Sequence, residues 1–379
     1  MSDPVDILKS VSATLNGRDL IELSGTIFIA EDINSTFPRS MIQIARDSRY
    51  EMQEALAGNK LAITVQPQNG PALSVNHVVH SAKPMIHDGG KGLHGSIMGI
   101  DDDYSKFIEK RVTKAWDKKN TDEVCKEIYK EVGGSKKVVV SSGFKQASFT
   151  SPSLMPKQTI DKCLALSQAG SKGFFFNTHE NGGTANFRTM KDMASKGAKR
   201  RFTFNAAGAA DPSTLGDPSV IFDLTYEGSS VSSQKQTKAQ GERYSPQFGK
   251  VEKNDRAGQG LSTPGLGVKA GEAQVGYKIQ NTIEQERDEK RHSDRDQQNL
   301  NEYSAKLKIL VPIATDLHAG DVIEVNSGSA TYFSDASPSN AASGKWLIVA
   351  VLHTVHLGGN EQAPAHTGRT LLHCVGKLS

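Results

Sequence analysis

The chain has 379 residues, and its 45 basic and 42 acidic side chains leave a net charge of +3, so its composition provides no general electrostatic attraction for nucleic acid. A mean hydropathy of −0.45 is typical of a soluble protein, and the longest apolar run, residues 346–352, is too short to cross a bilayer. The sequence therefore predicts no membrane insertion and about two to four compact units.

Two further features restrict the class of protein. Residues 1–15 lack the basic start and apolar stretch of a secretory signal, so we expect the chain to begin its life in a cytoplasm. The three cysteines, Cys125, Cys163 and Cys374, are odd in number and far apart, which excludes a disulfide framework built from them. None belongs to a C-x-x-C motif, so we expect structural thiols rather than a catalytic or redox site.

Residues 1–100 are predicted to form a small antiparallel β domain. Apolar and more polar side chains alternate from Ile21 to Ile29, and the pattern returns over residues 41–45. Apolar runs at 61–65 and 73–79 predict further short strands. The runs are separated by residues that favour turns, namely Pro38, Gly58, Pro67, Gly70 and Pro71. This spacing indicates a small barrel or sandwich.

Residues 101–200 are predicted to form a mixed α/β domain. The apolar spacing becomes helical over residues 104–116, directly after three acidic residues that favour a helix N-terminus. A second helix is predicted to begin at Asn120 or Thr121 and to end at the glycine pair 133–134.

A third helix and a hairpin complete this domain. The helix is predicted over residues 156–169 and ends at Gly170. Two short strands follow, at 173–177 and 184–189, and the Asn-Gly-Gly sequence at 181–183 between them is typical of a tight hairpin turn.

Residues 201–300 are predicted to contain strands, a long polar loop and a charged connector. From 228 to about 276, Ser, Gln, Lys and Gly dominate, which indicates a segment without regular structure or a binding arm that orders on a partner. The mixed charges at 284–296, within the polar stretch 281–301, favour a solvated helix or connector.

Residues 301–379 are predicted to form a second small β domain, with an alternating strand at 305–313, a turn at 315–321 and two further apolar strands. The predicted fold class is therefore α+β and mainly β. Two small antiparallel barrel-like domains flank a mixed α/β middle domain.

Several short motifs suggest chemistry, but simpler explanations are favoured. Residues 90–95 match G-x-G-x-x-G, yet Gly99 and the acidic residues 101–103 interrupt the helix that a nucleotide-binding turn requires, so we expect a loop. We interpret the three aspartates as a helix cap and solvated loop, because paired carboxylates for glycoside hydrolysis cannot be recognised from spacing alone.

The histidine pairs His77 with His80 and His353 with His356 are three residues apart in β-type sequence, which places each pair on opposite faces of a sheet. A metal site built from His353, His373 and a distant acid is an alternative, but the sequence has no H-E-x-x-H motif and no cysteine pair to support it. We assign no catalytic, cofactor-binding or metal-binding residue, and we expect no cofactor.

Basic residues form two clusters. Their members are Lys106, Lys110, Arg111, Lys114, Lys118 and Lys119 in the first, and Lys191, Lys196, Lys199, Arg200 and Arg201 in the second. Because aromatic residues make up only 6% of the chain, stacking platforms for bases are scarce, and we interpret the clusters as solvated faces of amphipathic helices. A positive surface beside a channel for DNA is the weaker alternative.

Taken together, the order of these elements resembles the baseplate hub protein of contractile-tailed bacteriophages, which is related to the hub part of the type VI secretion spike. The segments that carry the resemblance are 121–134, 156–189 with Phe174-Phe175-Phe176, 301–313, 317–325 and 343–349. They cover roughly half of the chain, within 120–200 and 280–379.

The resemblance implies a structural virion protein that is not an enzyme. It implies a homotrimer with two barrel-like domains per subunit, which forms a pseudo-six-fold ring between the tail tube protein and the central spike protein. It also implies contacts with other baseplate proteins, DNA passing through the ring, and a place in the tail baseplate after assembly in the host cytoplasm. Two alternatives are a tail-associated enzyme that degrades the cell wall, which needs an acid pair in a cleft, and a nucleic-acid-binding protein with salt-dependent affinity.

Overall fold

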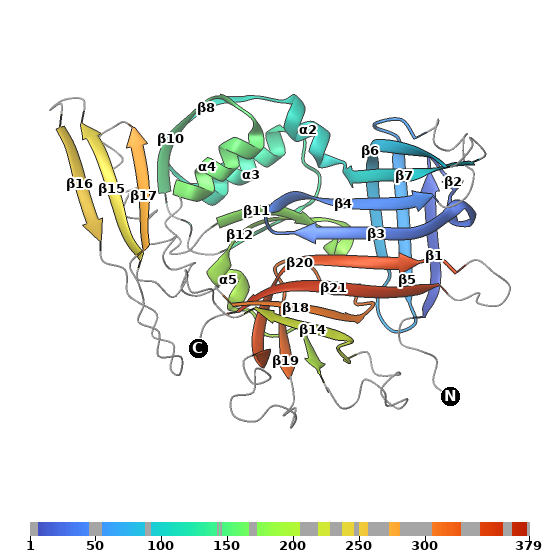
Figure 1. Cartoon of the computed structure of the whole chain (residues 1–379). Helices are drawn as coiled ribbons and strands as arrows, with labels where there is room; N and C mark the ends of the chain where they lie inside the picture. Colours follow the sequence, from blue (N-terminus) through green and yellow to red (C-terminus); the bar gives the residue numbers. More distant parts are fainter. Residues whose placement is uncertain are drawn as a thin grey trace, which may run out of the picture.

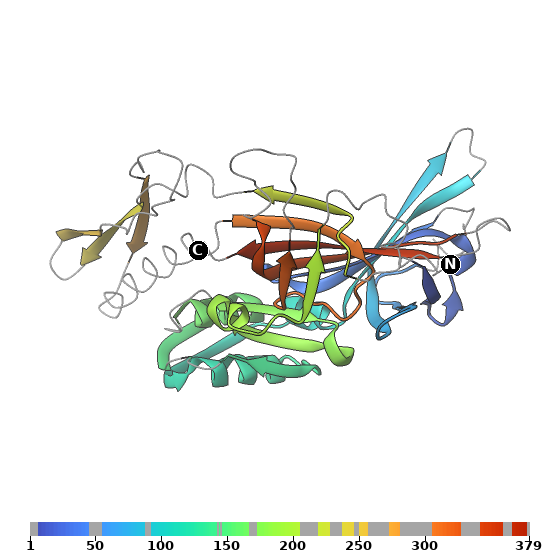
Figure 2. The same ribbon diagram turned by 90° about the horizontal axis from the view of Figure 1, so that it is seen from below.

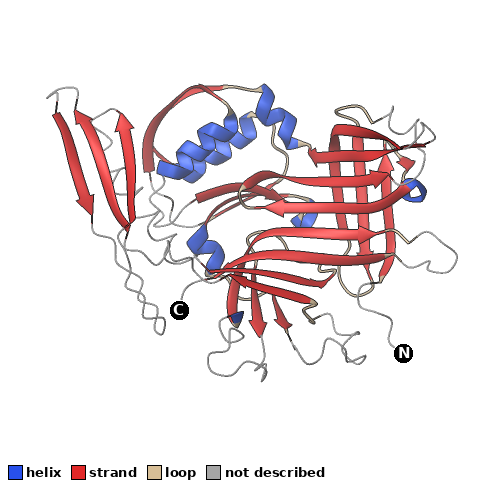
Figure 3. Cartoon of the chain, in the orientation of Figure 1, coloured by secondary structure: helices blue, strands red, loops and turns tan. Residues whose placement is uncertain are grey.

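A computed structural model describes most of the chain (Figure 1). The described residues are 7–44, 55–87, 92–141, 144, 146–166, 173–204, 219–227, 237–245, 250–256, 273–280, 305–326, 342–358 and 366–376. Strands predominate, and the longer helices gather in one part of the molecule (Figure 3), so the prediction of a mainly β protein is confirmed. The predicted connector at 284–296 lies outside the described residues.

One large sheet joins the two ends of the chain. The N-terminal strands are β1 (Leu8–Leu15), β2 (Arg18–Asp19), β3 (Ser24–Asp32), β4 (Ser35–Ile44), β5 (Lys60–Pro67), β6 (Leu73–His87) and β7 (Gly92–Asp101). The later strands are β13 (Arg200–Thr203), β14 (Asp223–Glu227), β18 (Ala305–Pro312), β19 (Val322–Asn326), β20 (Gly344–His356) and β21 (Thr367–Gly376).

These 13 strands follow the order β14-β18-β21-β20-β3-β4-β7-β6-β5-β1-β2, with β19 on β20 and β13 on β19. The two sets meet where β3 and β20 pair antiparallel, with Ile29 opposite His353. The described strands form an open order that ends at β14 and β2, so two separate closed barrels are not confirmed. Backbone pairing across β3 and β20 makes the two predicted end modules one continuous sheet.

The large sheet bends on itself, so that β1 and β5 run crosswise to β3, β4, β20 and β21 (Figure 1). Because side chains alternate across a strand, β5 turns Leu61, Ile63 and Val65 inward, and each is almost fully buried. They pack in one cluster with Ile27 of β3 and Val355 of β20, so both ends of the chain contribute to the same core.

The middle unit, residues 103–194, lies against one side of this sheet (Figure 2). Its elements are α2 (Asp103–Glu109), β8 (Val112–Asn120), α3 (Thr121–Glu131), β9 (Lys137–Val140), β10 (Gln146–Leu154), α4 (Pro156–Leu166), β11 (Gly173–Thr178), β12 (Thr184–Thr189) and α5 (Met190–Ala194). Strand β12 pairs with β11 antiparallel and with β9 parallel, and helices α3 and α4 pack together beside them.

The second predicted helix is confirmed as α3. Asn120 is its N-cap, and Gly133 follows its end with a φ of +87°, a conformation that glycine adopts without strain. The third predicted helix is confirmed as α4 for the residues described, and the predicted hairpin is confirmed as β11 and β12.

The predicted helix over 104–116 is wrong in its second half. Helix α2 ends at Glu109, Lys110 is extended with a ψ of 158°, and Val112 begins strand β8. Trp116 stacks on Phe149 of β10, with ring centroids 4.8 Å apart, within an antiparallel pair. Val112 and Trp116 are four residues apart and both buried, a spacing that fits one face of a helix and also fits strand β8. Pairing with β10 decides that this segment is a strand.

The sequence predicts that residues 228–276 lack regular structure or form a binding arm that orders on a partner, and the first of these expectations is wrong at the positions that the structure describes. Strands β15 (Thr237–Ser245), β16 (Lys250–Arg256) and β17 (Ala273–Gln280) form a separate three-stranded sheet, in which β15 pairs with both neighbours. Backbone hydrogen bonds between these strands stabilise the sheet, and local composition does not reveal them.

Aromatic rings form the core of the middle unit. Phe175 of β11 stacks on Phe187 of β12 with centroids 4.7 Å apart and planes 5° apart. It also contacts the rings of Phe37, Phe107 and Tyr129, so it joins β4 of the large sheet to α2 and α3. This cluster fixes the middle unit on the sheet.

Replacing Phe175 with Ala removes these contacts and leaves a cavity, so we expect the free energy of unfolding to fall by about 3–5 kcal/mol. The control is Ile108→Ala on α2, because the Ile108 side chain is 45% exposed and its loss should cost under about 1 kcal/mol. Urea unfolding followed by circular dichroism measures both. Equal losses for the two variants would contradict this account of the core.

Candidate functional site

A buried carboxylate joins three distant parts of the chain. Glu31, near the end of β3, is 2% exposed. Its Oε1 accepts hydrogen bonds from the backbone N–H of His179, at 2.7 Å, and lies 2.9 Å from Nδ1 of His179 and 3.1 Å from Nδ1 of His318. Its Oε2 accepts from the backbone N–H of Ala319 at 3.1 Å. We call Glu31, His179, His318 and Ala319 the junction.

At the junction, the Glu31 carboxylate and the His318 imidazole each stabilise the charged form of the other. Burial acts to raise the pKa of the Glu31 carboxyl, but the two imidazoles hold that pKa well below its usual range. Burial acts to lower the pKa of His318, yet the adjacent Glu31 carboxylate raises it above its usual value. The junction is therefore an ionised carboxylate surrounded by donors.

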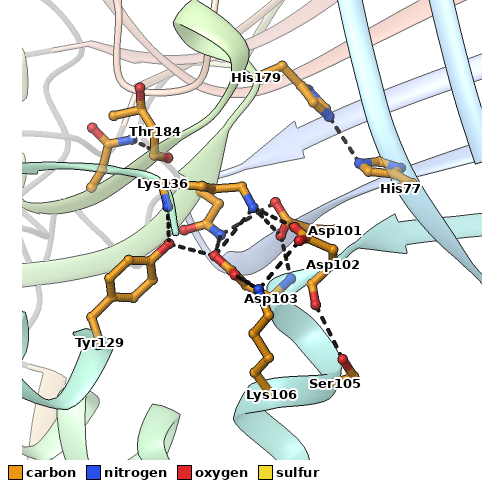
Figure 4. Close-up of polar contacts among 12 residues, drawn as sticks. His77, Asp101, Asp102, Asp103, Ser105, Lys106, Tyr129, Lys136, His179 and Thr184 are labelled. Carbon is orange, nitrogen blue, oxygen red and sulfur yellow. Dashed lines mark hydrogen bonds and ion pairs between the residues drawn. The ribbon is translucent and has the colours of Figure 1, made fainter. Parts of the chain in front are cut away.

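A chain of polar contacts extends from the junction into β6 and β4. His179 Nε2 lies 3.1 Å from His77 Nε2, and His77 Nδ1 lies 2.8 Å from the Ser40 hydroxyl (Figure 4 shows the two imidazoles pointing toward each other). One arrangement satisfies every atom: Ser40 donates to His77, His77 donates to His179, and His179 donates to Glu31. Burial, followed by the charges of His179 and Lys136, lowers the pKa of His77 well below its usual value.

Asp101, Asp102 and Asp103 form a carboxylate cluster at the end of β7 and the start of α2. Lys136 reaches into it, with Nζ 2.7, 2.8 and 3.3 Å from the three carboxylates in turn (Figure 4). Tyr129 donates a hydrogen bond to Asp103 at 2.5 Å, and Lys106 lies 2.8 Å from Asp103. The prediction of a solvated loop is wrong, because Asp101 and Asp103 are buried and compensated by these lysines.

The environments of the neighbouring acids differ. Burial raises the pKa of Asp101 despite its contact with Lys136. Burial acts in the same direction on Asp102, but Lys136 and Lys106 bring the pKa of that more exposed carboxyl below its usual value. Because Lys136 binds both acids, these carboxylates act in this structure as counter-ions of an ammonium group.

A cavity of about 610 Å³ separates the carboxylate cluster from the histidine chain. Its walls come from β5 and β6 of the large sheet and from the β11–β12 turn of the middle unit, and they include His77, His179, Asp101, Asp102 and Lys136. The cavity is therefore an opening between the two parts of the fold.

The histidines predicted to lie on opposite faces do so. His77 and His353 are buried, whereas His80 and His356 are exposed. The alternative metal site of His353 and His373 is not formed, because His353 is buried and His373 is exposed on the adjacent strand.

Of the G-x-G-x-x-G motif, residues 92–95 belong to strand β7 and residues 90–91 lie outside the described part, so the required turn into a helix is not seen at the described positions.

The cysteines match the expectation of structural thiols. Cys125, Cys163 and Cys374 are buried and free. Burial raises the pKa of the Cys125 and Cys374 thiols, which keeps them in the unreactive protonated form.

Many residues of the two basic clusters are bound to acids. Lys114 and Lys119 of β8 both bind Glu127 of α3, and Lys114 also lies 2.8 Å from Glu131. In the second cluster the ion pairs are Lys199 with Asp321 at 2.9 Å, Arg200 with Asp316 at 3.0 Å and Arg201 with Glu324 at 2.9 Å. Lys106 and Lys191 lie on helices α2 and α5, in line with the prediction. The paired residues named above do not; they lie on or beside strands, where they bind neighbouring elements.

The junction was not predicted from the sequence, although one signal for it is present there. Glu31 is in phase with Ile27 and Ile29 on the inward face of β3, and His77 is in phase with Val75 and Val79 on β6. A charged residue on the apolar side of an alternating strand indicates a buried partner. Its partners come from residues 179 and 318, which no local pattern connects to it.

The fold has known counterparts. A tail protein from Neisseria meningitidis MC58 superposes with a TM-score of 0.61 and 10% identity, over 97% of this chain and 96% of that one. The chain has the fold of a phage tail protein. The 43 kDa tail protein of prophage MuSo2 from Shewanella oneidensis gives a TM-score of 0.60 and 12% identity, over 97% of this chain and 98% of that chain.

The same fold occurs in type VI secretion. The E. coli c3393 protein, a component of that system with structural similarity to the T4 tail proteins gp27 and gp5, gives a TM-score of 0.52 and 9% identity, over 97% of this chain and 76% of that chain. The predicted resemblance is confirmed at the level of fold. No family model and no curated protein matches the sequence. Among the described residues, no helix is both long and apolar enough to cross a membrane.

Lys136 is predicted to stabilise the carboxylate cluster. Lys136→Met leaves the buried Asp101 without its counter-ion and the buried Asp103 with Lys106 alone, so we expect the free energy of unfolding to fall by about 3 kcal/mol. The control is Lys126→Met, which removes an exposed pair with Asp122 and should cost at most about 0.5 kcal/mol. Urea unfolding at pH 7 compares them. A loss for Lys136→Met no larger than that of the control would disprove the assignment.

His353 is predicted to make stability depend on pH. Burial lowers its pKa to about 3, and its Nε2 has no hydrogen-bond partner among the described atoms. Below its ordinary pKa of about 6.5, this histidine therefore binds a proton in the unfolded chain but not in the folded chain. The free energy of unfolding then decreases as the pH is lowered, by up to about 1.4 kcal/mol per pH unit.

In His353→Gln this contribution disappears, so the stability difference between the variant and the unaltered chain should change steadily between pH 6.5 and 4.5. His356→Gln, which removes an exposed imidazole from the same strand, is the control for the substitution. Unfolding curves at several pH values provide the measurement, and a pH-independent difference for His353→Gln would show that this histidine is not buried in its neutral form.

Proposed function

We propose that this chain is a structural protein of a phage-type tail, and specifically the baseplate hub of a contractile tail. The observation that carries the proposal is the shared fold with the Neisseria tail protein over almost the full length of both chains. A likeness that covers both chains entirely favours a common architectural role over a shared catalytic module.

We infer that the hub is a homotrimer. Each chain provides two sets of strands joined at β3 and β20, so three chains would offer six related sheet portions toward a six-fold tail tube and three equivalent faces toward a central spike. Strands β14 and β2 end the order of the described sheet and are suited to pair with neighbouring subunits. In this arrangement the segments 1–100, 101–200, 201–300 and 301–379 act as successive domains of one subunit.

The proposed partners are the tail tube protein, the central spike protein and other baseplate proteins. The proposal assigns the protein to the baseplate of the virion after assembly in the host cytoplasm, with DNA passing through the ring. The ion pairs of the basic clusters favour a role in holding neighbouring elements together over direct binding of phosphates.

An enzyme that degrades the cell wall is the second candidate, because Asp101 and Asp102 line the cavity and their pKa values are shifted in opposite directions. The Lys136 ion pairs with both acids oppose it, since a general acid must release its proton to a substrate. Clearing of cell wall in a zymogram by the unaltered chain, abolished by Asp102→Asn, would favour this enzyme over the hub.

We expect the purified chain to have about three times its subunit mass of 40.9 kDa in light scattering coupled to size exclusion. Dilution should not dissociate a trimer held by paired strand edges, because each interface adds backbone hydrogen bonds and apolar burial. A monomer at all concentrations, which also fails to form a ring when mixed with tube and spike proteins, would contradict the hub. Salt-dependent DNA binding by that monomer would favour the nucleic-acid alternative.

A further inference from the structure

The histidine pair at the cavity has the geometry of two metal ligands. His77 is on β6, and His179 follows β11 of the middle unit; both line the cavity. Their Nε2 atoms lie 3.1 Å apart, and their ring centroids lie 5.1 Å apart with an interplanar angle of 40° (Figure 4). Two nitrogens bound to one tetrahedral Zn²⁺ at 2.0–2.1 Å are separated by roughly 3.3 Å, so only a small movement of the rings would admit an ion between them.

The opposite nitrogen of each imidazole is already held. His179 Nδ1 is 2.9 Å from the buried Glu31 carboxylate, and His77 Nδ1 is 2.8 Å from the Ser40 hydroxyl. Ion binding would move the His77 proton from Nε2 to Nδ1, which would then donate to the Ser40 hydroxyl, while His179 keeps its proton on Nδ1. Both Nε2 lone pairs would then be free for an ion. Ligand histidines are usually oriented in this way, by a carboxylate or another oxygen at the second ring nitrogen.

The surrounding charge also favours a cation. Four carboxylates, those of Glu31, Asp101, Asp102 and Asp103, lie in the junction and the carboxylate cluster beside the cavity. Their counter-charges are Lys106, Lys136 and the His318 imidazole that contacts Glu31. The three aspartates have oxygens within 4.8 Å of one another, but the Lys136 ammonium occupies the centre of that group. Imidazole nitrogens, in contrast, suit Zn²⁺, Cu²⁺ and Ni²⁺.

We propose that His77 and His179 bind one divalent transition-metal ion, with Zn²⁺ as the reference ion, and that water from the cavity completes its coordination. The ion would replace the hydrogen bond between the two rings. Because one ligand belongs to the large sheet and the other to the middle unit, the ion would link the two parts of the fold across the cavity. The inference rests on this geometry and is independent of the proposed function.

The test uses the full chain without a histidine tag, stripped of metal by a chelator and then dialysed. Titration with Zn²⁺ in competition with a chromophoric chelator should give one ion per chain. His77→Gln and His179→Gln should each weaken binding by at least about 100-fold, and Ser40→Ala by about 10-fold, because it removes only the group that orients His77. The matched control, His80→Gln, changes an exposed histidine on the same strand and should bind as the unaltered chain does.

Each variant is first compared with the unaltered chain by thermal melting without metal, so that loss of folding is separated from loss of a ligand. X-ray absorption of the Zn²⁺-loaded unaltered chain needs no variant and should show two imidazoles per ion at about 2.0 Å. Absence of stoichiometric binding, affinity unchanged by His77→Gln in a folded variant, or a spectrum without imidazole ligands would each overturn the proposal.

Discussion

Burial of the Glu31 carboxylate is the constraint that organises the described part of this protein. A charge removed from water must be compensated nearby, and Glu31 obtains two backbone N–H donors and two imidazoles from segments 148 and 287 or 288 residues away along the chain. The β11–β12 turn and the turn before β19 therefore meet at the end of β3. This meeting point, together with the Phe175 cluster, holds the N-terminal strands, the middle unit and the C-terminal strands in their relative placement.

Apolar packing and ion pairs reinforce the same arrangement. Phe175 joins the middle unit to β4, while Lys136 joins the β9 side of that unit to the acids at the end of β7. Both kinds of contact favour one fixed orientation, the first through shape and the second through the cost of an uncompensated carboxylate. A rigid subunit of this kind suits a protein whose proposed role is to hold a tube and a spike in register.

Local patterns predicted those elements whose signals are complete within a short stretch of sequence. Helix α3 has its N-cap at Asn120, a buried face and a glycine stop at Gly133, and β5 shows strict alternation over Leu61, Ile63 and Val65. Prediction was wrong over 112–116, where spacing alone did not distinguish a helix from strand β8. It was also wrong at the described positions of the segment 228–276, where strands β15, β16 and β17 pair in spite of a polar composition. In both places, pairing with a partner strand determines the backbone conformation.

The sequence by itself indicated a mainly β protein, located helices α3 and α4 and excluded a disulfide framework, because alternation, capping and cysteine spacing are local properties. The alternation in β3 and β6 also puts Glu31 and His77 in phase with buried apolar residues, but neither was predicted from it. Only the tertiary structure decided that β3 pairs with β20, that both ends form one sheet, and that Glu31, His77, His179 and His318 meet. Such contacts join residues far apart in sequence, and the energy that selects them comes from burial and pairing that no short segment contains.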